Sequence, residues 1–169
     1  MDVETAIRTR RTHKAYAPEP LPSEQIDELL ELASWAPNHN LTVPWRFRVI
    51  GPKTLRRLKE VAGPEGALKL DRAPTLIVVS CVLGGDPVEE EEDLHATAAA
   101  SYIVLLAAHA RGLAGYWRTP AILRSAEGRA AVGLSEDERF VALLHLGHPR
   151  QEKLAPERPG ADRTTTYLD

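Results

Sequence analysis

Four residues near the start of the chain could together bind an anion. Arg10, Arg11, Thr12 and Lys14 lie in the stretch RRTHKAY, residues 10–16, which places three cations and a hydroxyl within five residues. Guanidinium, ammonium and hydroxyl groups, together with loop amides, are the donors that suit a phosphate monoester. The same residues could instead be a solvated basic helix end that balances the helix dipole. The sequence leaves both interpretations open.

Two further stretches carry polar side chains where a ligand could reach them. His39 lies in the proline-bounded loop APNHNLTVP, where it either faces a ligand or is simply exposed. The segment GYWRTP, residues 115–120, places two aromatic rings, a cation and a hydroxyl at the end of an expected strand. Trp117 could be ordinary packing, but Arg118 directly after it favours contact with the edge of a planar ligand.

Other kinds of catalytic or metal site find little support. Both glycine-rich phosphate loops, G-x-x-x-x-G-K-[ST] and G-x-G-x-x-G, are absent, and so is the G-x-S-x-G of hydrolases. His145 and His148 form an H-x-x-H pair, but no second pair follows at zinc spacing. The acidic run at 89–93 is expected to be solvated charge near a helix N-terminus. Cys81, the single cysteine, lies in the apolar run TLIVVSCVL and is expected to be buried and inert. We therefore expect no metal and no nucleophilic catalysis.

Composition limits the partners of the chain. Its 169 residues suit one domain spanning 1–169, and its formal net charge of −3 argues against nucleic-acid binding, which needs a basic face. No stretch approaches the roughly 18 apolar residues of a membrane span. The N-terminal MDVETAIRTR carries acids where a signal peptide would be basic and then apolar. We expect a cytoplasmic protein that binds neither nucleic acid nor membrane.

Hydrophobic periodicity predicts the elements that must position these side chains. Helices are expected over 2–9, 23–36, 53–63 and 93–112, strands over 45–51, 73–83, 113–119 and 139–149, and a broken helical stretch over 120–133. The strands at 73–83 and 139–149 are apolar on both faces and should be inner strands, with 93–112 as a central buried helix. This order predicts an α+β sheet packed by helices. The tail at 151–169 ends in TTTYL, which has strand propensity and is expected to pair with a sheet edge on a second subunit.

The order of these motifs resembles the nitroreductase family of flavin enzymes, especially its small single-domain NAD(P)H branch. The resemblance is carried along the whole chain by RRTHKAY, APNHNLTVPWRFRVI, RAPTLIVV, the apolar helix, GLAGYWRT and LHLGHP. It implies an α+β fold with a mixed sheet flanked by helices. It also implies a homodimer with one FMN in each of two sites at the subunit interface.

The resemblance assigns cofactor-binding roles to the residues already singled out. By similarity, the phosphate and ribityl oxygens of FMN would be held by Arg10, Arg11, Thr12 and Lys14. His39 would lie beside the cofactor bound to the partner subunit. The stretch along the isoalloxazine would be Trp117, Arg118 and Thr119.

Two positions depart from the family pattern. Trp35 stands where close relatives often have an arginine that reaches FMN, so Lys14 or Arg158 is expected to supply that charge. Val43 replaces a glutamine that is common before the P-W pair, which predicts a less polar wall of the substrate cleft.

The implied activity is hydride transfer from NADH or NADPH through flavin N5 to a nitroaromatic, a quinone or a similar small acceptor. The flavin carries this chemistry, so no side chain needs to act as acid or base, and Arg118 is our candidate for electrostatic stabilisation of the reduced flavin. One alternative is a non-catalytic FMN or nucleotide binding module that senses the cofactor. A second, an acetyltransferase suggested by ARGLAG, is disfavoured because Ala114 occupies a glycine position of the acyl-CoA loop.

Overall fold

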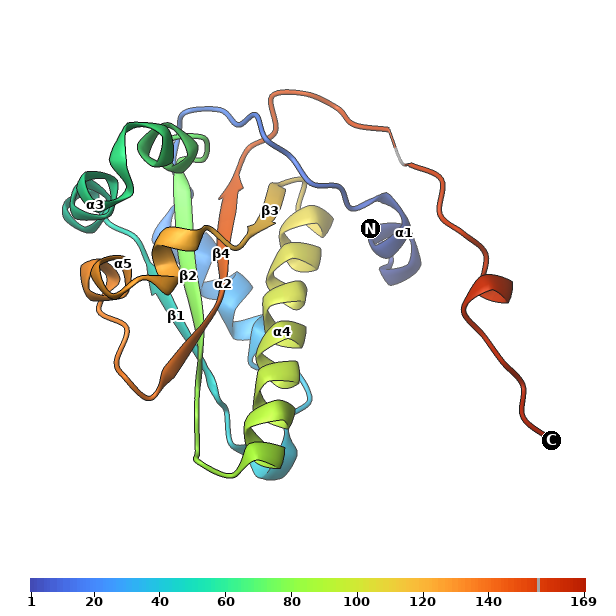
Figure 1. Cartoon of the computed structure of the whole chain (residues 1–169). Coiled ribbons are helices and arrows are strands. Elements are labelled where there is room, and N and C mark those ends of the chain that lie inside the picture. Colours follow the sequence, from blue (N-terminus) through green and yellow to red (C-terminus); the bar gives the residue numbers. More distant parts are fainter. Residues whose placement is uncertain (155) are drawn as a thin grey trace.

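The computed structural model describes residues 1–154 and 156–169 and has a sheet covered by helices on both faces (Figure 1). The strands are β1 (Trp45–Val49), β2 (Thr75–Val82), β3 (Ala114–Arg118) and β4 (Glu138–Gly147), in the spatial order β1-β2-β4-β3. The helices are α1 (Val3–Thr9), α2 (Ser23–Ala33), α3 (Pro52–Leu70), α4 (Pro87–Ala110) and α5 (Ala126–Val132). Short 3-10 turns lie at His39–Leu41, Ala121–Arg124 and Ala161–Arg163.

The predicted α+β class is confirmed, and its parallel component is small. All three neighbouring pairs of strands run antiparallel. Parallel pairing comes from an isolated bridge between Thr12 and Gly115, which ties the N-terminal segment to β3. The sheet is therefore mixed only through this single bridge in the described chain.

Two apolar cores lie on opposite faces of the sheet. The period of two along β2 sends Ile77 and Val79 toward α2 and α4, and Leu76 and Val78 toward α3 and α5. All of these side chains are buried, as expected for a strand covered on both sides. The prediction that β2 and β4 are the inner strands is confirmed by the strand order.

Helix α4 runs the length of the domain, as its apolar composition predicted (Figure 1). Asp86 caps its N-terminus by accepting hydrogen bonds from two backbone amides. Near the other end, β3 packs so closely on α4 that a Cβ at Gly115 would lie 2.7 Å from Leu105 Cδ2. Glycine at this position therefore allows the strand that carries GYWRTP to lie against the helix.

Several helix boundaries differ from the sequence-based expectation. Helix α4 begins at Pro87, ahead of the expected 93, and α2 ends at Ala33, ahead of the expected 36. The predicted cap Ser23 is instead the first residue of α2, and Pro22 occupies the capping position without a side-chain hydrogen bond. Helix α3 extends beyond 63 to Leu70 because Gly63 adopts φ +68° and lets the chain kink and resume as helix through Pro64. None of the described helices is both long and apolar enough to cross a membrane.

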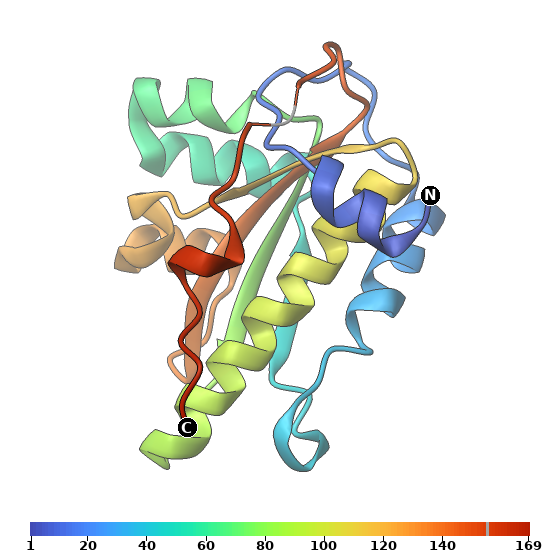
Figure 2. The ribbon, with the colours of Figure 1, turned by 90° about the vertical axis from the view of Figure 1, so that its right-hand side faces the viewer.

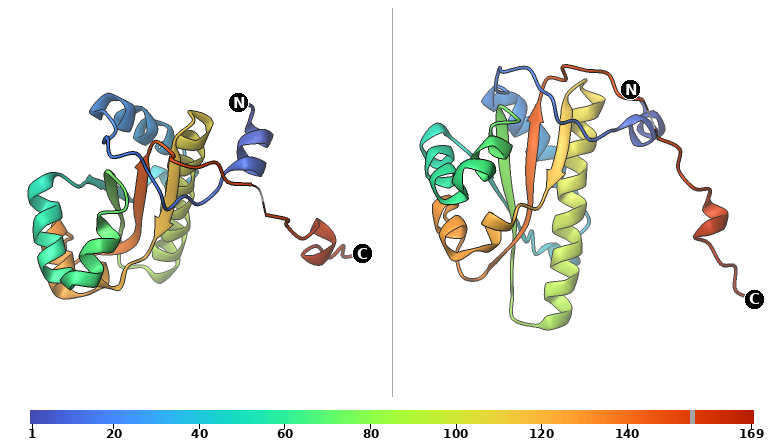
Figure 3. Two further views of the ribbon diagram at one scale, coloured as in Figure 1. Left: turned by 90° about the horizontal axis from the view of Figure 1, so that it is seen from above. Right: turned by 45° about the horizontal axis from the view of Figure 1, so that its top comes forward.

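The C-terminal tail leaves the body beside α1 and ends away from the sheet (Figure 2, Figure 3). Its base is attached, because Pro149 bridges to Tyr16 and the Arg150 amide donates to Ala15 O at 3.3 Å. Beyond the base, Tyr167 and Leu168 are about nine-tenths exposed. The segment TTTYL belongs to no strand in the described chain, so its pairing with a partner stays a prediction.

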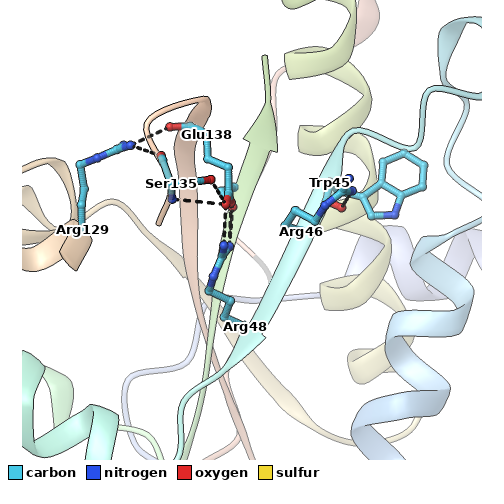
Figure 4. Close-up of polar contacts among 7 residues, drawn as sticks. Trp45, Arg46, Arg48, Arg129, Ser135 and Glu138 are labelled. Carbon is cyan, nitrogen blue, oxygen red and sulfur yellow. Dashed lines mark hydrogen bonds and ion pairs between the residues drawn. The ribbon is translucent and has the colours of Figure 1, made fainter. Parts of the chain in front are cut away.

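A buried ionic network joins β1, β2 and β4 at the end of the sheet where β4 begins (Figure 4). Glu138 at the start of β4 accepts hydrogen bonds from Arg48 of β1 at 2.5 and 2.7 Å, and from the hydroxyls of Ser80 and Ser135. Arg129 of α5 donates to the backbone oxygens of Ser135 and Glu138. Burial alone would raise the pKa of Glu138, but the hydrogen bonds from Arg48, Ser80 and Ser135 outweigh it and lower the pKa to about 2.

We expect Glu138→Gln to lower the free energy of unfolding by about 3 kcal/mol at pH 7, because Arg48 then lacks its buried counter-charge. The contribution of Glu138 is fully present above its ordinary pKa of 4.5 and is lost as the pH falls toward about 2. Urea titrations between pH 3 and 7 should therefore show a flatter pH dependence for the variant. The exposed neighbour Glu136 provides the control, since Glu136→Gln should behave like the native chain. Equal pH dependence of Glu138→Gln and the native chain would contradict this account.

Candidate functional site

The basic segment at 10–16 runs in extended form beside the start of β3. His13 N donates to Gly115 O at 3.1 Å, and Thr12 and Tyr16 form bridges to Gly115 and Pro149. In an extended chain successive side chains point to opposite sides. The four predicted residues are therefore divided between the two sides of the segment, and they do not form one continuous cluster.

One side of this segment forms a groove of about 780 Å³, which we call the basic groove. It lies between α1, the C-terminal end of α4 and the base of the tail. Its charged and titratable lining residues are Arg11, His13, His109, Arg150, Glu152 and Lys153. Arg10, Thr12 and Lys14 lie outside its wall. Three permanent cations thus face one carboxylate, which makes the groove a site of positive potential.

Several donors at the segment have no protein acceptor. The Nε atoms of Arg10 and Arg11 are buried, and neither has a hydrogen-bond partner among the described residues. Arg11 Nη1 donates to Arg10 O at 2.6 Å, and the Arg10 guanidinium lies 5.4 Å from the centre of the Tyr102 ring. Lys153 donates to Thr12 O at 3.0 Å. Unmatched buried donors beside unpaired cations are the features that a bound anion would satisfy.

Two histidines share the positive field of the groove. Burial, and then the positive charges of Arg10 and Arg11, lower the pKa of His109. Burial, and then Lys153 and His109, lower the pKa of His13. Neutral imidazoles are therefore favoured at neutral pH while the groove holds no anion.

The residues of GYWRTP separate to the two faces of β3. Trp117 packs against the core formed with α2 and α4. Arg118 points to the α3 face, where Nη1 donates to Lys69 O at 3.0 Å and the guanidinium lies 5.9 Å from the centre of the Tyr116 ring. It lines a small cavity of about 220 Å³ with Lys69 and other residues of α3. Thr119 follows the strand and is exposed.

His39 lies far from the basic groove within one chain. Its Nδ1 is 3.6 Å from Glu92 on the N-terminal half of α4, whereas Arg10 lies over Tyr102 of the same helix. Ten residues of α-helix separate these two contacts, which corresponds to about 15 Å along the axis. A single chain therefore does not bring His39 to the other predicted residues.

The loop around His39 has an unusual backbone. Asn40, Leu41 and Val43 all have positive φ, which non-glycine residues rarely adopt. Asn38 Oδ1 accepts from Val43 N at 3.0 Å, and Thr42 Oγ1 donates to Asp93 at 2.6 Å, so both ends of the turn are fixed. Strained loops of this kind often occur at functional sites.

The two departures from the family pattern lie apart from the basic segment. Trp35 is 81% exposed and lines an apolar groove with residues of α1, α2 and α4. Arg158 is exposed in the tail. Val43, also exposed, lies in the strained loop.

The two histidines of the H-x-x-H pair lie in different environments. His145 is fully buried, with both ring nitrogens unpartnered, and burial together with Arg118 and Arg72 lowers its pKa to about 3. His148 is exposed. The described residues contain no group of three side chains able to hold a metal ion. Cys81 is buried, as predicted, and burial raises its pKa.

Sequence reasoning missed His13, His109, Arg150 and Lys153 as neighbours of the basic segment. His13 could have been found, because alternation in an extended RRTHKAY places it beside Arg11. The other three come from the end of α4 and from the tail base, and no local pattern links them to residues 10–14.

Comparison with known proteins identifies relatives that are named as nitroreductases or nitroreductase-like proteins. The nitroreductase family model matches residues 7–67. Over 156 residues the chain is 36% identical to a Methanothermobacter thermautotrophicus protein with the provisional name NADH dehydrogenase/NAD(P)H nitroreductase, covering 89% of this chain and 79% of that protein.

Solved structures agree in fold. A nitroreductase-like family protein from Bacillus cereus has a TM-score of 0.90 at 23% identity, covering 100% of this chain and 97% of that one. A Desulfovibrio desulfuricans protein, provisionally named a nitroreductase, was solved in complex with FMN. It has a TM-score of 0.83 at 29% identity, and the match covers 100% of this chain and 98% of that chain.

Proposed function

The chain belongs to the nitroreductase family, and from this premise we propose that it is an FMN-dependent oxidoreductase that uses NADH or NADPH. The unmatched cationic donors around the basic segment carry this proposal most directly. They are the groups that the phosphate of FMN would satisfy. The Desulfovibrio relative, 29% identical, was solved in complex with FMN, which supports FMN as the cofactor.

The proposed phosphate and ribityl contacts are Arg10, Arg11, Thr12 and Lys14. Arg11 forms a wall of the basic groove, while Arg10, Thr12 and Lys14 lie outside it. The isoalloxazine would extend along the end of β3, past Trp117 and Arg118 to Thr119. The Thr12–Gly115 bridge supports this placement because it brings the basic segment beside β3, two residues before Trp117.

We propose that the site is completed by a second copy of the chain, which supplies His39. The distance along α4 between the His39 contact and the Arg10 contact supports this, because one chain keeps the two apart. An apolar groove of about 350 Å³, formed by α1, α2 and α4, is the proposed contact surface, and it includes Val3, Leu32, Trp35 and Leu106. Exposed apolar patches of this kind mark protein interfaces.

The tail of the second copy has a matching place on the sheet. β3 pairs only with residues 143–147 of β4, so residues 138–142 have no strand on that side among the described residues. Arg124 and Arg139 line a groove of about 490 Å³ there, together with apolar side chains. We propose that TTTYL of the partner adds to this edge, where Asp169 would meet the two arginines.

Bound FMN supplies the redox chemistry, accepting a hydride at N5 from NADH or NADPH and passing it to a nitroaromatic, a quinone or a similar acceptor. The protein residues then serve to bind, orient and stabilise. Arg118 is the proposed stabiliser of the negative charge on the reduced flavin. Its guanidinium donates to Lys69 O, which leaves further N–H donors for a ligand. No side chain is needed as acid or base.

Absorption spectroscopy of the purified protein tests the proposed function. We expect a yellow protein whose flavin band bleaches anaerobically with NADPH or NADH and returns when a quinone or nitroaromatic is added. A flavin that binds but is not reduced by either nucleotide would favour the binding-module alternative. A protein that takes up no flavin would contradict the proposal altogether.

Arg118→Ala should lower the midpoint potential of the bound flavin, because a positive charge near the reduced anion is removed. We expect a shift on the order of 30 mV, equivalent to about 1.4 kcal/mol for two electrons. Spectroelectrochemistry measures it. Arg56→Ala, which removes an exposed arginine of α3, is the control, and an unchanged potential in Arg118→Ala would remove the assignment.

Trp35→Glu should weaken the dimer at least tenfold, because it introduces a charge into the proposed apolar interface. Sedimentation equilibrium measures the dissociation constant of the dimer. If His39 acts across the interface, the fraction of protein that retains flavin should fall as the dimer weakens. Leu68 is similarly exposed, at 72%, but lies on α3. Leu68→Glu should therefore leave the dimer intact, and equal behaviour of the two variants would place the interface elsewhere.

A further inference from the structure

The basic groove contains more positive charge than its own carboxylate can balance. Arg11, Arg150 and Lys153 face Glu152, and none of the three cations forms an ion pair among the described residues. The groove lies at the C-terminal end of α4, where His109 adds an imidazole to these cations. Its donor set suits a phosphate monoester.

Hydrogen bonding fixes the tautomer of His109. Thr9 Oγ1 donates its single proton to Thr5 O at 2.6 Å, so it can only accept from His109 Nε2, which is 2.8 Å away. The neutral ring therefore carries its proton on Nε2 and has a free lone pair on Nδ1. A second proton can be added at Nδ1 without breaking the bond to Thr9.

The charges around His109 explain why that second proton is absent without an anion. Burial and the charges of Arg10 and Arg11 hold the ring neutral at neutral pH. On its own helix Arg111 is paired with Glu28 of α2 at 3.7 Å. The remaining titratable or charged groups that line the groove are Met1, Arg11, His13, Arg150, Glu152 and Lys153. A phosphate dianion would reverse the sign of this field.

We propose that the basic groove is a phosphate-monoester site in which His109 is a ligand that gains a proton when the anion binds. The inference deepens the proposed function and rests on it for the source of the phosphate. The shared chemistry is a phosphate dianion, which could be that of FMN or the 2′-phosphate of NADPH. One proton is taken from solvent to Nδ1, and no bond of the ligand changes.

The linkage has a definite direction. Because the anion-bound form holds one more proton, affinity should fall as the pH rises, by up to about tenfold per pH unit. Phosphate monoesters have a second pKa near 6, so between pH 7.5 and 9 the ligand stays a dianion and proton uptake must come from the protein.

The first experiment does not depend on flavin. Ring signals of His109 in the flavin-free full-length chain are followed by NMR against pH, in chloride and in inorganic phosphate at equal ionic strength. The titration midpoint of His109 should rise in phosphate, while that of His95, an exposed residue on the same helix, should not. Equal midpoints for His109 in the two salts would overturn the proposal.

The second experiment identifies the source of the phosphate. Calorimetry at pH 8 in two buffers of different ionisation heat counts the protons taken up with FMN, with riboflavin, and, for the FMN-loaded protein, with NADPH and NADH. Uptake with FMN but not riboflavin assigns the groove to the cofactor. Uptake with NADPH but not NADH assigns it to the nucleotide. Absence of uptake with both phosphate-bearing ligands would overturn the proposal.

His109→Gln is the discriminating variant, because the amide can still donate to Thr9 but cannot titrate. The variant should lose proton uptake, and its affinity for the phosphate-bearing ligand should change less with pH than that of the native chain. His95→Gln is the control and should keep both. Full proton uptake by His109→Gln would reject His109 as the ligand. Failure to bind either flavin would contradict the proposed function, while the NMR result would still decide the phosphate site.

Discussion

Unbalanced positive charge at one end of the sheet is the constraint on which the proposed site depends. Arg10 and Arg11 lie where α4 ends, so the helix dipole favours them, typically by 0.3–1 kcal/mol each. Each also buries an Nε without an acceptor, which costs about 1–3 kcal/mol. The dipole is thus too weak to account for the arrangement. The proposed anion site accounts for these donors, because a bound anion would supply the acceptors that the two Nε atoms lack.

Backbone contacts, not side-chain pairs, hold these cations together. The bridge between Thr12 and Gly115 and the bond from His13 N to Gly115 O attach the segment to β3. The close approach of β3 to α4 at Gly115 then fixes the segment relative to the helix end. Because the sheet orders the segment, the Nε donors of Arg10 and Arg11 stay available for a ligand, although Arg11 Nη1 and Lys153 each donate to a backbone oxygen.

Elements were predictable from the sequence where periodicity was strong. The two-sided apolar strand around Val78 and the apolar helix around Val104 both appear where they were expected. The division of the basic cluster was missed because it depends on an extended segment that has no hydrophobic period. The contact between Lys153 and Thr12 spans 141 residues, and nothing local in either stretch predicts it. Arg118 and Trp117 separate simply because adjacent strand residues face opposite ways.

The strained loop at 38–43 shows how the part of the proposed site that contains His39 can be ordered in a free chain. Residues in the left-handed region cost of order 1 kcal/mol or more each, and this loop contains three. Asn38 holds Val43, and Asp93 of α4 holds Thr42, so the strain is supported by the chain that carries it. His39 therefore has a defined position before any partner binds. A two-fold dimer would bring this preformed loop to the basic segment of the other chain, since symmetry makes the relation reciprocal.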